Sequence, residues 1–263
     1  MNDKFDNALR HALTPSEEAD FWLNQKIINQ AKEKRIMIEK NNDRKSRRLT
    51  AAVIAAAVLC ISSVTAYAAW KYLSSSDVAG NVQDGKLADA FSGEQAHIIN
   101  ETQSCGDYRV TLLSIISGKM LSEYPHYHND VIDEDRTYAV IAIENVNGIP
   151  MPDASEMGDG KPEFFASPLI GDYNPAFYNI AGMSGNYTDM TEEGILYRLL
   201  ECSNVEIFAD HPLYLCVSEG MFYDTEAYCY DELTGKISRN ENYEGLNVLF
   251  ELPADITKAD PER

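Results

Sequence analysis

The clearest feature of the hydrophobic pattern is an uncharged run near the N-terminus. Residues 49–70 read LTAAVIAAAVLCISSVTAYAAW, which is 22 residues without Asp, Glu, Lys or Arg. As a helix rising 1.5 Å per residue, this run reaches about 33 Å, enough to cross a hydrocarbon core of about 30 Å. The aromatic residues Tyr67, Trp70 and Tyr72 stand where an outer interfacial belt belongs. The pattern therefore predicts one transmembrane helix over residues 49–72.

The charges beside this run predict its orientation. Residues 34–48 hold seven Lys and Arg side chains, whereas residues 71–85 hold only Lys71. By the positive-inside rule, the N-terminus is expected in the cytoplasm and the C-terminal part outside. Two other interpretations stay open: a buried Ala-rich helix, and a signal-peptidase site at residues 66–68 behind an unusually long n-region.

The segment before the run predicts two amphipathic helices. Phe5, Ala8, Leu9, Ala12 and Leu13 follow the i, i+3, i+4, i+7 spacing of one helical face. Residues 14–17 (TPSE) then supply an N-cap, a Pro at the first helical position and a Glu at N3, which is a capping box. The second helix is expected to run to about residue 40. We therefore interpret residues 1–48 as a cytoplasmic amphipathic helical segment.

The apolar stripe of the second helix needs something to cover it. A 48-residue segment is too small to bury large apolar side chains by itself. Either a protein partner covers them, or a two-helix hairpin lies on the inner leaflet of the membrane. We predict the partner, with a binding face formed by Phe21, Trp22, Leu23, Ile27 and Ile28.

Beyond the run, the pattern changes from helical to strand-like. Residues 73–95 are rich in Ser, Asp, Gly and Ala and are interpreted as a linker with a short helix near residues 86–91. After it, segments rich in Val, Ile, Tyr and Phe alternate with clusters of Gly, Asn, Asp and Pro. The segments are residues 97–102, 108–118, 136–146, 163–170, 195–208, 213–218 and 246–252. Residues 96–263 are thus expected to form a mainly β, extracytoplasmic domain: an immunoglobulin-like β-sandwich of about seven strands.

The charge balance excludes one class of partner. The chain carries 42 acidic and 22 basic side chains, and residues 49–263 hold 34 and 11 of them, a net charge of −23. So negative a domain repels phosphate backbones, and we expect no direct contact with nucleic acid.

Cysteine chemistry leaves two alternatives. Five cysteines in 263 residues are too few for a disulfide-built scaffold. If residues 195–208 and 213–218 form a hairpin, Cys202 and Cys216 face each other across it. A disulfide between them outside the cell and two buried free thiols are equally compatible with the sequence.

Catalytic chemistry is hardly represented. The densest group of metal-capable side chains reads as an acidic, solvated loop rather than a metal site. It consists of His126, His128, Asp130, Asp133, Glu134 and Asp135. The GMSG run around Ser184 misses the nucleophile elbow by one residue, and no phosphate-binding Gly loop or H-E-x-x-H motif occurs. We expect no catalytic residues, no metal, no cofactor and no enzymatic activity.

Several long stretches resemble a known family. They include ALTPSEEADFWLNQKI, AYAAWKYL, YRVTLLSIISGK, DRTYAVIAIENVNGIPMPD and YRLLECSNVEIFADHPLYLCVSEG. On these stretches the whole chain resembles a bacterial family of single-pass membrane proteins catalogued as domain of unknown function 4179. Its members resemble transmembrane anti-sigma factors in layout, and some carry that label. Residues 1–48 contain no Cys, so the chain lacks the His-x-x-x-Cys-x-x-Cys motif of zinc-binding anti-sigma domains.

The resemblance and the layout together predict a membrane signalling protein. Its N-terminal helices are expected to bind a cytoplasmic sigma factor or other regulator through the zinc-free stripe, and its outer β domain to sense an unknown ligand. The alternative is a membrane-anchored surface module whose outer domain binds a ligand and which has no regulatory role.

Overall fold

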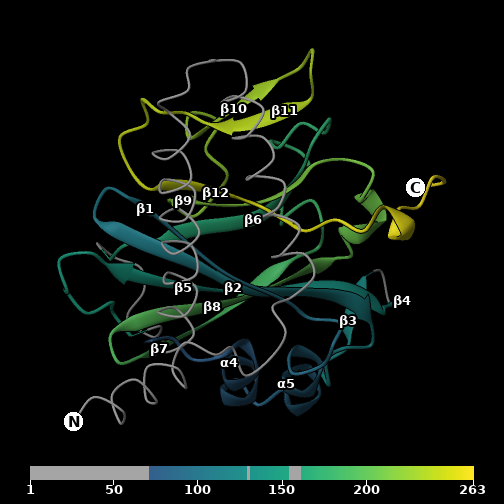
Figure 1. The fold of residues 1–263 in the computed structure, drawn as a ribbon, viewed down its shortest axis with the longest axis horizontal. Helices are drawn as coiled ribbons and strands as arrows, with labels where there is room; N and C mark the ends of the chain where they lie inside the picture. The colour runs from purple at the N-terminus through teal and green to yellow at the C-terminus, as the bar shows by residue number, and fades with distance from the viewer. Residues whose placement is uncertain (1–70, 129–130, 154–160) are drawn as a thin grey trace, which may run out of the picture. The chain divides into compact units, whose positions relative to one another are not determined.

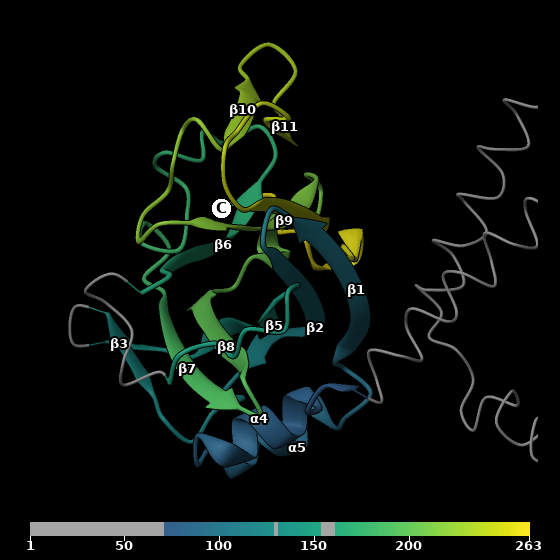
Figure 2. The ribbon, with the colours of Figure 1, turned by 90° about the vertical axis from the view of Figure 1, so that its left-hand side faces the viewer.

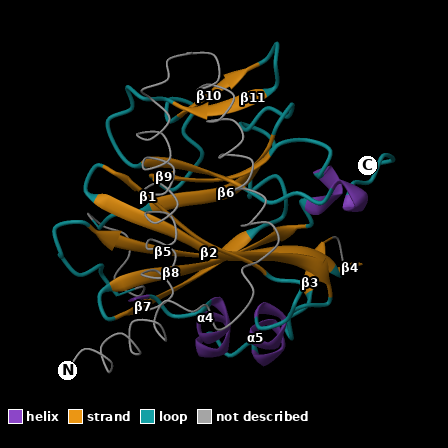
Figure 3. Ribbon diagram, viewed as in Figure 1, coloured by secondary structure: helices purple, strands orange, loops and turns teal. Residues whose placement is uncertain are grey.

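The fold of the described residues is mainly β (Figure 1). The computed structural model describes residues 71–128, 131–153 and 161–263. Figure 3 separates the strands from the two short α-helices and the 3-10 turns. The helical elements are α4 (Ser75–Asn81), α5 (Gly85–Phe91), η2 (Glu206–Phe208) and η3 (Ile256–Lys258). The strands are β1 (His97–Cys105), β2 (Tyr108–Lys119), β3 (His126–His128), β4 (Val131–Asp133), β5 (Asp135–Asn145), β6 (Phe164–Ile170), β7 (Asn186–Glu192), β8 (Ile195–Ser203), β9 (Leu213–Glu219), β10 (Tyr228–Asp231), β11 (Lys236–Arg239) and β12 (Asn247–Glu251).

Two antiparallel sheets form the body of the domain. The larger has the order β1-β2-β5-β8-β7 and the smaller the order β12-β9-β6. Two ribbons, β3-β4 and β10-β11, are added to them. Neighbouring strands in both sheets pair antiparallel, so the chain can join them through hairpins and loops without parallel crossovers.

The main hydrophobic core lies between the two sheets. Leu112 and Ile141 point into it from the larger sheet, and Leu169, Leu215 and Phe250 from the smaller one. All five side chains are less than 2 % exposed. At about 25 cal/mol per Å² of buried apolar surface, this shared core is the main source of stability that the two sheets have in common.

The edges of the two sheets meet beside β1. The amide of Gln103 on β1 donates from Nε2 to the Leu249 carbonyl at 2.8 Å and accepts from the Leu249 amide at 3.2 Å. The glutamine side chain thus takes the place of a strand partner for β12. The backbone groups of Leu249 at this edge are therefore satisfied and are not available for pairing with another strand.

The second face of the larger sheet is covered by helices, as Figure 2 shows. Val78 of α4 and Leu87 and Phe91 of α5 pack on Leu113 and Val140 of the sheet. Strands β2 and β5 are therefore apolar on both faces, which explains their nearly continuous buried runs. This third layer departs from a two-layer immunoglobulin-like sandwich, in which the outer faces are polar.

The prediction of a linker over residues 73–95 is wrong for most of its length. Ser74 and Asp77 form a capping box at the start of α4, and Asp84 caps α5 through the Leu87 amide. Both seven-residue helices are too short to persist alone, so they depend on the sheet for stability. The short helix expected near residues 86–91 is confirmed as α5.

The predicted transmembrane helix, residues 49–72, lies outside the described residues up to residue 70. Within the part that the structure describes, no helix has both the length and the apolarity to cross a bilayer. Its last two residues are described, and Tyr72 is 8 % exposed in the cluster beneath α4 and α5. Tyr72 therefore belongs to the β domain and not to an interfacial belt.

The strand predictions hold where the apolar pattern is strong. Six of the seven predicted segments coincide with β1, β2, β5, β6, β9 and β12 to within a few residues. The seventh, residues 195–208, contains β8, but the strand ends at Ser203 and the chain turns into η2. Strands β3, β4, β7, β10 and β11 were not predicted, and the described residues hold twelve strands where about seven were expected.

Candidate functional site

The predicted partner face lies outside the described residues. Phe21, Trp22, Leu23, Ile27 and Ile28 all precede residue 71, so their role stays a prediction from the sequence. The candidate chemistry of the described residues lies in four places. They are the cysteines, a hydrogen-bonded network around the buried Arg136, a polar cluster around Glu144 and a polar surface hollow.

Cys202 and Cys216 are free, buried thiols. Cys202 lies on β8, which pairs with β5 and β7, whereas Cys216 lies on β9, which pairs with β6 and β12. The hairpin expected between these strands does not form, because residues 204–212 carry the chain from one sheet to the other. Of the two alternatives left open by the sequence, the free thiols are correct and the disulfide is wrong.

We expect the two thiols to resist alkylation. Burial raises the pKa of Cys202 and of Cys216 to about 12, so neither forms a thiolate at neutral pH. Iodoacetamide at about pH 8 should modify the exposed Cys229 in the folded chain and leave both buried thiols unmodified until urea is added. Peptide mass spectrometry reads the result. Labelling of Cys202 or Cys216 as fast as Cys229, or a disulfide-linked peptide pair, contradicts this assignment.

The histidine and carboxylate segment forms the β3-β4 ribbon. His126 and Asp133 are cross-strand partners in it, and Asp130 lies outside the described residues. Among the described residues, no three His, Cys, Asp or Glu side chains are grouped to hold a metal ion. Asp133 instead accepts a hydrogen bond from Arg136 at 2.7 Å, and Asp135 accepts one from Asn204 at 2.9 Å.

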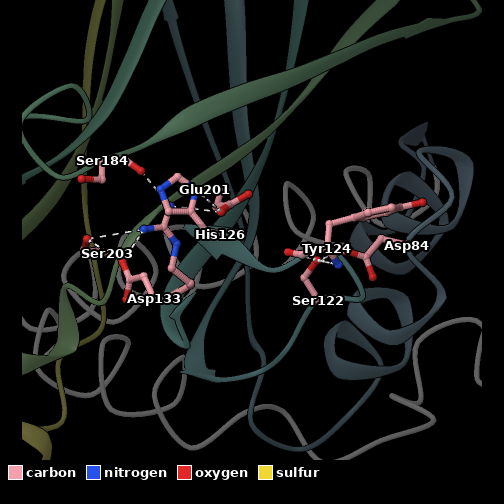
Figure 4. A network of polar contacts seen from close by, with 9 residues as sticks. Asp84, Ser122, Tyr124, His126, Asp133, Ser184, Glu201 and Ser203 are labelled. Atoms are coloured by element: carbon pink, nitrogen blue, oxygen red, sulfur yellow. Dashed lines mark hydrogen bonds and ion pairs between the residues drawn. The ribbon is translucent and has the colours of Figure 1, made fainter. Parts of the chain in front are cut away.

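Arg136 contacts Asp133, Ser184 and Glu201, three residues that are labelled in Figure 4. It is 2 % exposed at the start of β5. Its Nη1 donates to Asp133, and its Nη2 donates to the Ser184 carbonyl at 2.8 Å. Oε1 of Glu201 lies 3.0 Å from Nη2 and 3.4 Å from Nδ1 of His126. One guanidinium thus balances two carboxylates in a largely desolvated place, where an unpaired charge is costly.

The network joins three segments that are far apart in sequence. Asp133 comes from the β3-β4 ribbon, Ser184 from the loop before β7, and Glu201 from β8. Sequence reasoning missed Arg136, although a single Arg opening an apolar strand and following an acidic run is a signal for a buried ion pair. Because the guanidinium is 2 % exposed and both of its terminal nitrogens are paired, the geometry favours a structural role.

A second polar cluster gathers on Glu144 near the end of β5. Tyr72 donates from its hydroxyl to Oε1 at 2.7 Å, and Arg109 donates from Nη1 to the same oxygen at 3.0 Å. Lys71 pairs with Oε2. Burial opposes ionisation of this carboxyl, but the hydrogen bonds from Lys71, Tyr72 and Arg109 hold the pKa of Glu144 below its ordinary value. The carboxylate is therefore ionised and fully engaged at neutral pH.

A sizeable hollow on the described residues lies beside the β10-β11 ribbon. Its volume is about 410 Å³, and its lining includes Glu226, Asn240, Tyr243 and Glu244 but, among described residues, no Lys or Arg. Burial, together with the hydrogen bond that Tyr243 donates to Asp224 at 3.0 Å, raises the pKa of Tyr243 to about 12. The hollow is open and negatively charged, so it can accept a cationic group more readily than an anionic one.

The comparisons with known proteins add nothing to this geometry: no family model, curated protein or solved structure matches the chain. The family resemblance therefore stays a prediction from the sequence. The remaining evidence on function is the sequence and the arrangement of the described residues.

Proposed function

We propose that the protein is a single-pass membrane signalling protein similar to an anti-sigma factor. Residues 1–48 bind a cytoplasmic sigma factor or another regulator, residues 49–70 cross the membrane, and the β domain lies outside the cell and senses a ligand. The observation that carries the proposal is the charge distribution around the uncharged run, with a basic N-terminal flank and an outer part of net charge −23.

The described domain supports this layout in one respect. Residues 71 and 72 enter the folded domain directly after the uncharged run, so any movement of the domain acts close to the membrane.

The partner face supplies the test. In the full-length chain extracted with detergent, Trp22→Ala combined with Ile27→Asp should abolish capture of a sigma factor, because it removes one large apolar contact and places a charge on another. The measurement is mass spectrometry of the pull-down eluate, with membrane insertion checked in parallel.

A matched pair of substitutions provides the control. Glu33→Ala combined with Gln30→Asp makes the same two kinds of change at polar positions after the five residues of the predicted face and should leave capture intact. Equal capture by the wild type and the Trp22/Ile27 variant, with normal insertion, contradicts the partner face.

A surface ligand-binding module is the second candidate, and the acidic hollow near Tyr243 is the observation that favours it. The two functions differ in what a deletion does. Removing residues 1–40 alters transcription if the N-terminal segment binds a regulator. It leaves transcription unchanged if that segment is only an anchor.

A further inference from the structure

The segment that leaves the predicted span is attached to the centre of the larger sheet. Glu144 on β5 accepts from Tyr72, pairs with Lys71 and accepts from Arg109, its cross-strand partner on β2. The Leu73 amide donates to the Tyr197 hydroxyl on β8 at 3.1 Å. Two adjacent strands, β5 and β8, therefore hold the first three described residues of the chain, and β2 supports Glu144 through Arg109.

The attachment continues into the two helices. Ser114 on β2 donates from its hydroxyl to that of Ser75, the first residue of α4, at 2.6 Å, and both residues are buried. Ser76 of α4 donates to the Ala88 carbonyl of α5 at 2.9 Å, and the Ser92 hydroxyl donates to that of Ser76 at 2.9 Å. Because each helix has only seven residues, neither is expected to stay folded once it leaves the sheet.

We propose that residues 71–92 form a latch that opens and closes as one unit on the β domain and carries movement of the domain to the predicted span. This inference rests on the proposed function for its biological meaning, but its structural part can be tested alone. The closed state is favoured because opening exposes the apolar face formed by Leu113, Tyr138, Val140 and their neighbours. Opening breaks the contacts of Glu144 and Tyr197 together, which makes the latch a two-state element.

The hollow beside β10-β11 and the β3-β4 ribbon give weaker evidence for a function than residues 71–92. In the hollow beside β10-β11, the Asn240 amide nitrogen is already used by the Glu226 carbonyl and the Tyr243 hydroxyl by Asp224, so these polar groups satisfy one another. The exposed Tyr127 and Ile132 of the β3-β4 ribbon form an apolar pair, but nothing in the structure indicates what covers it.

Hydrogen exchange followed by mass spectrometry tests the latch in the full-length chain in detergent. In the wild type, residues 71–91 should exchange with a common protection that is lower than that of β5 and β8. Glu144→Gln weakens the ionic acceptor of three donors, and Tyr197→Phe removes the acceptor of the Leu73 amide. Each should speed exchange across all of residues 71–91 by about tenfold and leave β5 and β8 unchanged.

Two substitutions at exposed sites are the matched controls. Glu251→Gln on β12 and Tyr127→Phe on β3 make the same chemical changes away from the latch and should leave exchange of residues 71–91 unaltered. The proposal is overturned if the wild-type amides of residues 71–74 exchange like an unstructured peptide. It is also overturned if Glu144→Gln and Tyr197→Phe leave exchange in α4 and α5 unchanged. Failure of sigma-factor capture with the exchange pattern intact contradicts the proposed function and not the latch.

Discussion

Replacing Arg136 by Met should destabilise the β domain by about 3–5 kcal/mol, which is the usual cost of removing one partner from a buried ion pair. The substitution keeps much of the aliphatic volume but leaves the carboxylates of Asp133 and Glu201 without the cation between them. It also removes the donor to the Ser184 carbonyl. Urea unfolding of the full-length chain in detergent, followed by far-UV circular dichroism, measures the effect. Tryptophan fluorescence is unsuitable, because Trp22 and Trp70 both precede the domain.

Two further variants serve as a control and as a rescue for this prediction. Lys119→Met removes a cation from an exposed position at the end of β2 and should change stability by less than about 0.5 kcal/mol. Adding Glu201→Gln to Arg136→Met should restore part of the lost stability, since it neutralises one of the two stranded carboxylates. An Arg136→Met domain as stable as the Lys119→Met control shows that the network is solvated and does not hold the ribbon.

The sequence predicts strands well where the apolar pattern is strong. It predicts them poorly where pairing with a neighbouring strand, or a turn, determines the backbone conformation. The sequence predicts β5 because an unbroken apolar run, residues 138–143, fills its centre. β7, with the sequence NYTDMTE, is an edge strand with little apolar surface, and its position is set by pairing to β8. Val205 and Phe208 extend the apolar pattern of β8, but they stand three residues apart and belong to the turn at η2. Periodicity over so few residues does not separate these cases.

The helical layer shows a different limit. The composition of residues 73–95 suggested a linker, because Ser, Asp, Gly and Ala are frequent there. The capping signals at Ser74 and Asp84, followed by Val78 and Leu87, were present in the sequence and indicate two helix starts. What the sequence could not show was the apolar second face of β2 and β5 that these helices need. That face is visible only once the strand order is known.

For the polar cluster around Glu144, the sequence likewise predicts the face of the strand but not the partners. Glu144 lies on the same face of β5 as Tyr138, Val140 and Ala142, and alternation alone predicts that shared face. Its partners come from residues 71, 72 and 109, and no pattern within one strand identifies them. The disulfide does not form for a related reason: the sequence places the two cysteines on either side of one turn, but the chain crosses between the sheets there.

Phe250→Ala should cost about 3–5 kcal/mol, because it empties a large, fully buried position between the two sheets. Phe250 lies on β12 opposite Leu215 of β9, within the core that both sheets share. Since the cavity is lined from both sides, the loss should be global. Hydrogen exchange should accelerate in β2, β5 and β8 as much as in β6, β9 and β12, and the urea midpoint should fall for the whole domain.

The distribution of the effect decides between one cooperative core and two stacked units. Leu233→Ala is the control, because this side chain is 96 % exposed in the turn of the β10-β11 ribbon and its truncation should change stability by less than about 0.5 kcal/mol. If Phe250→Ala accelerates exchange only in β6, β9 and β12, the smaller sheet unfolds by itself. In that case a ligand bound near it has no mechanical route to Glu144 and the latch. Uniform acceleration instead makes the two sheets a single body, through which binding at either sheet bears on residues 71–92.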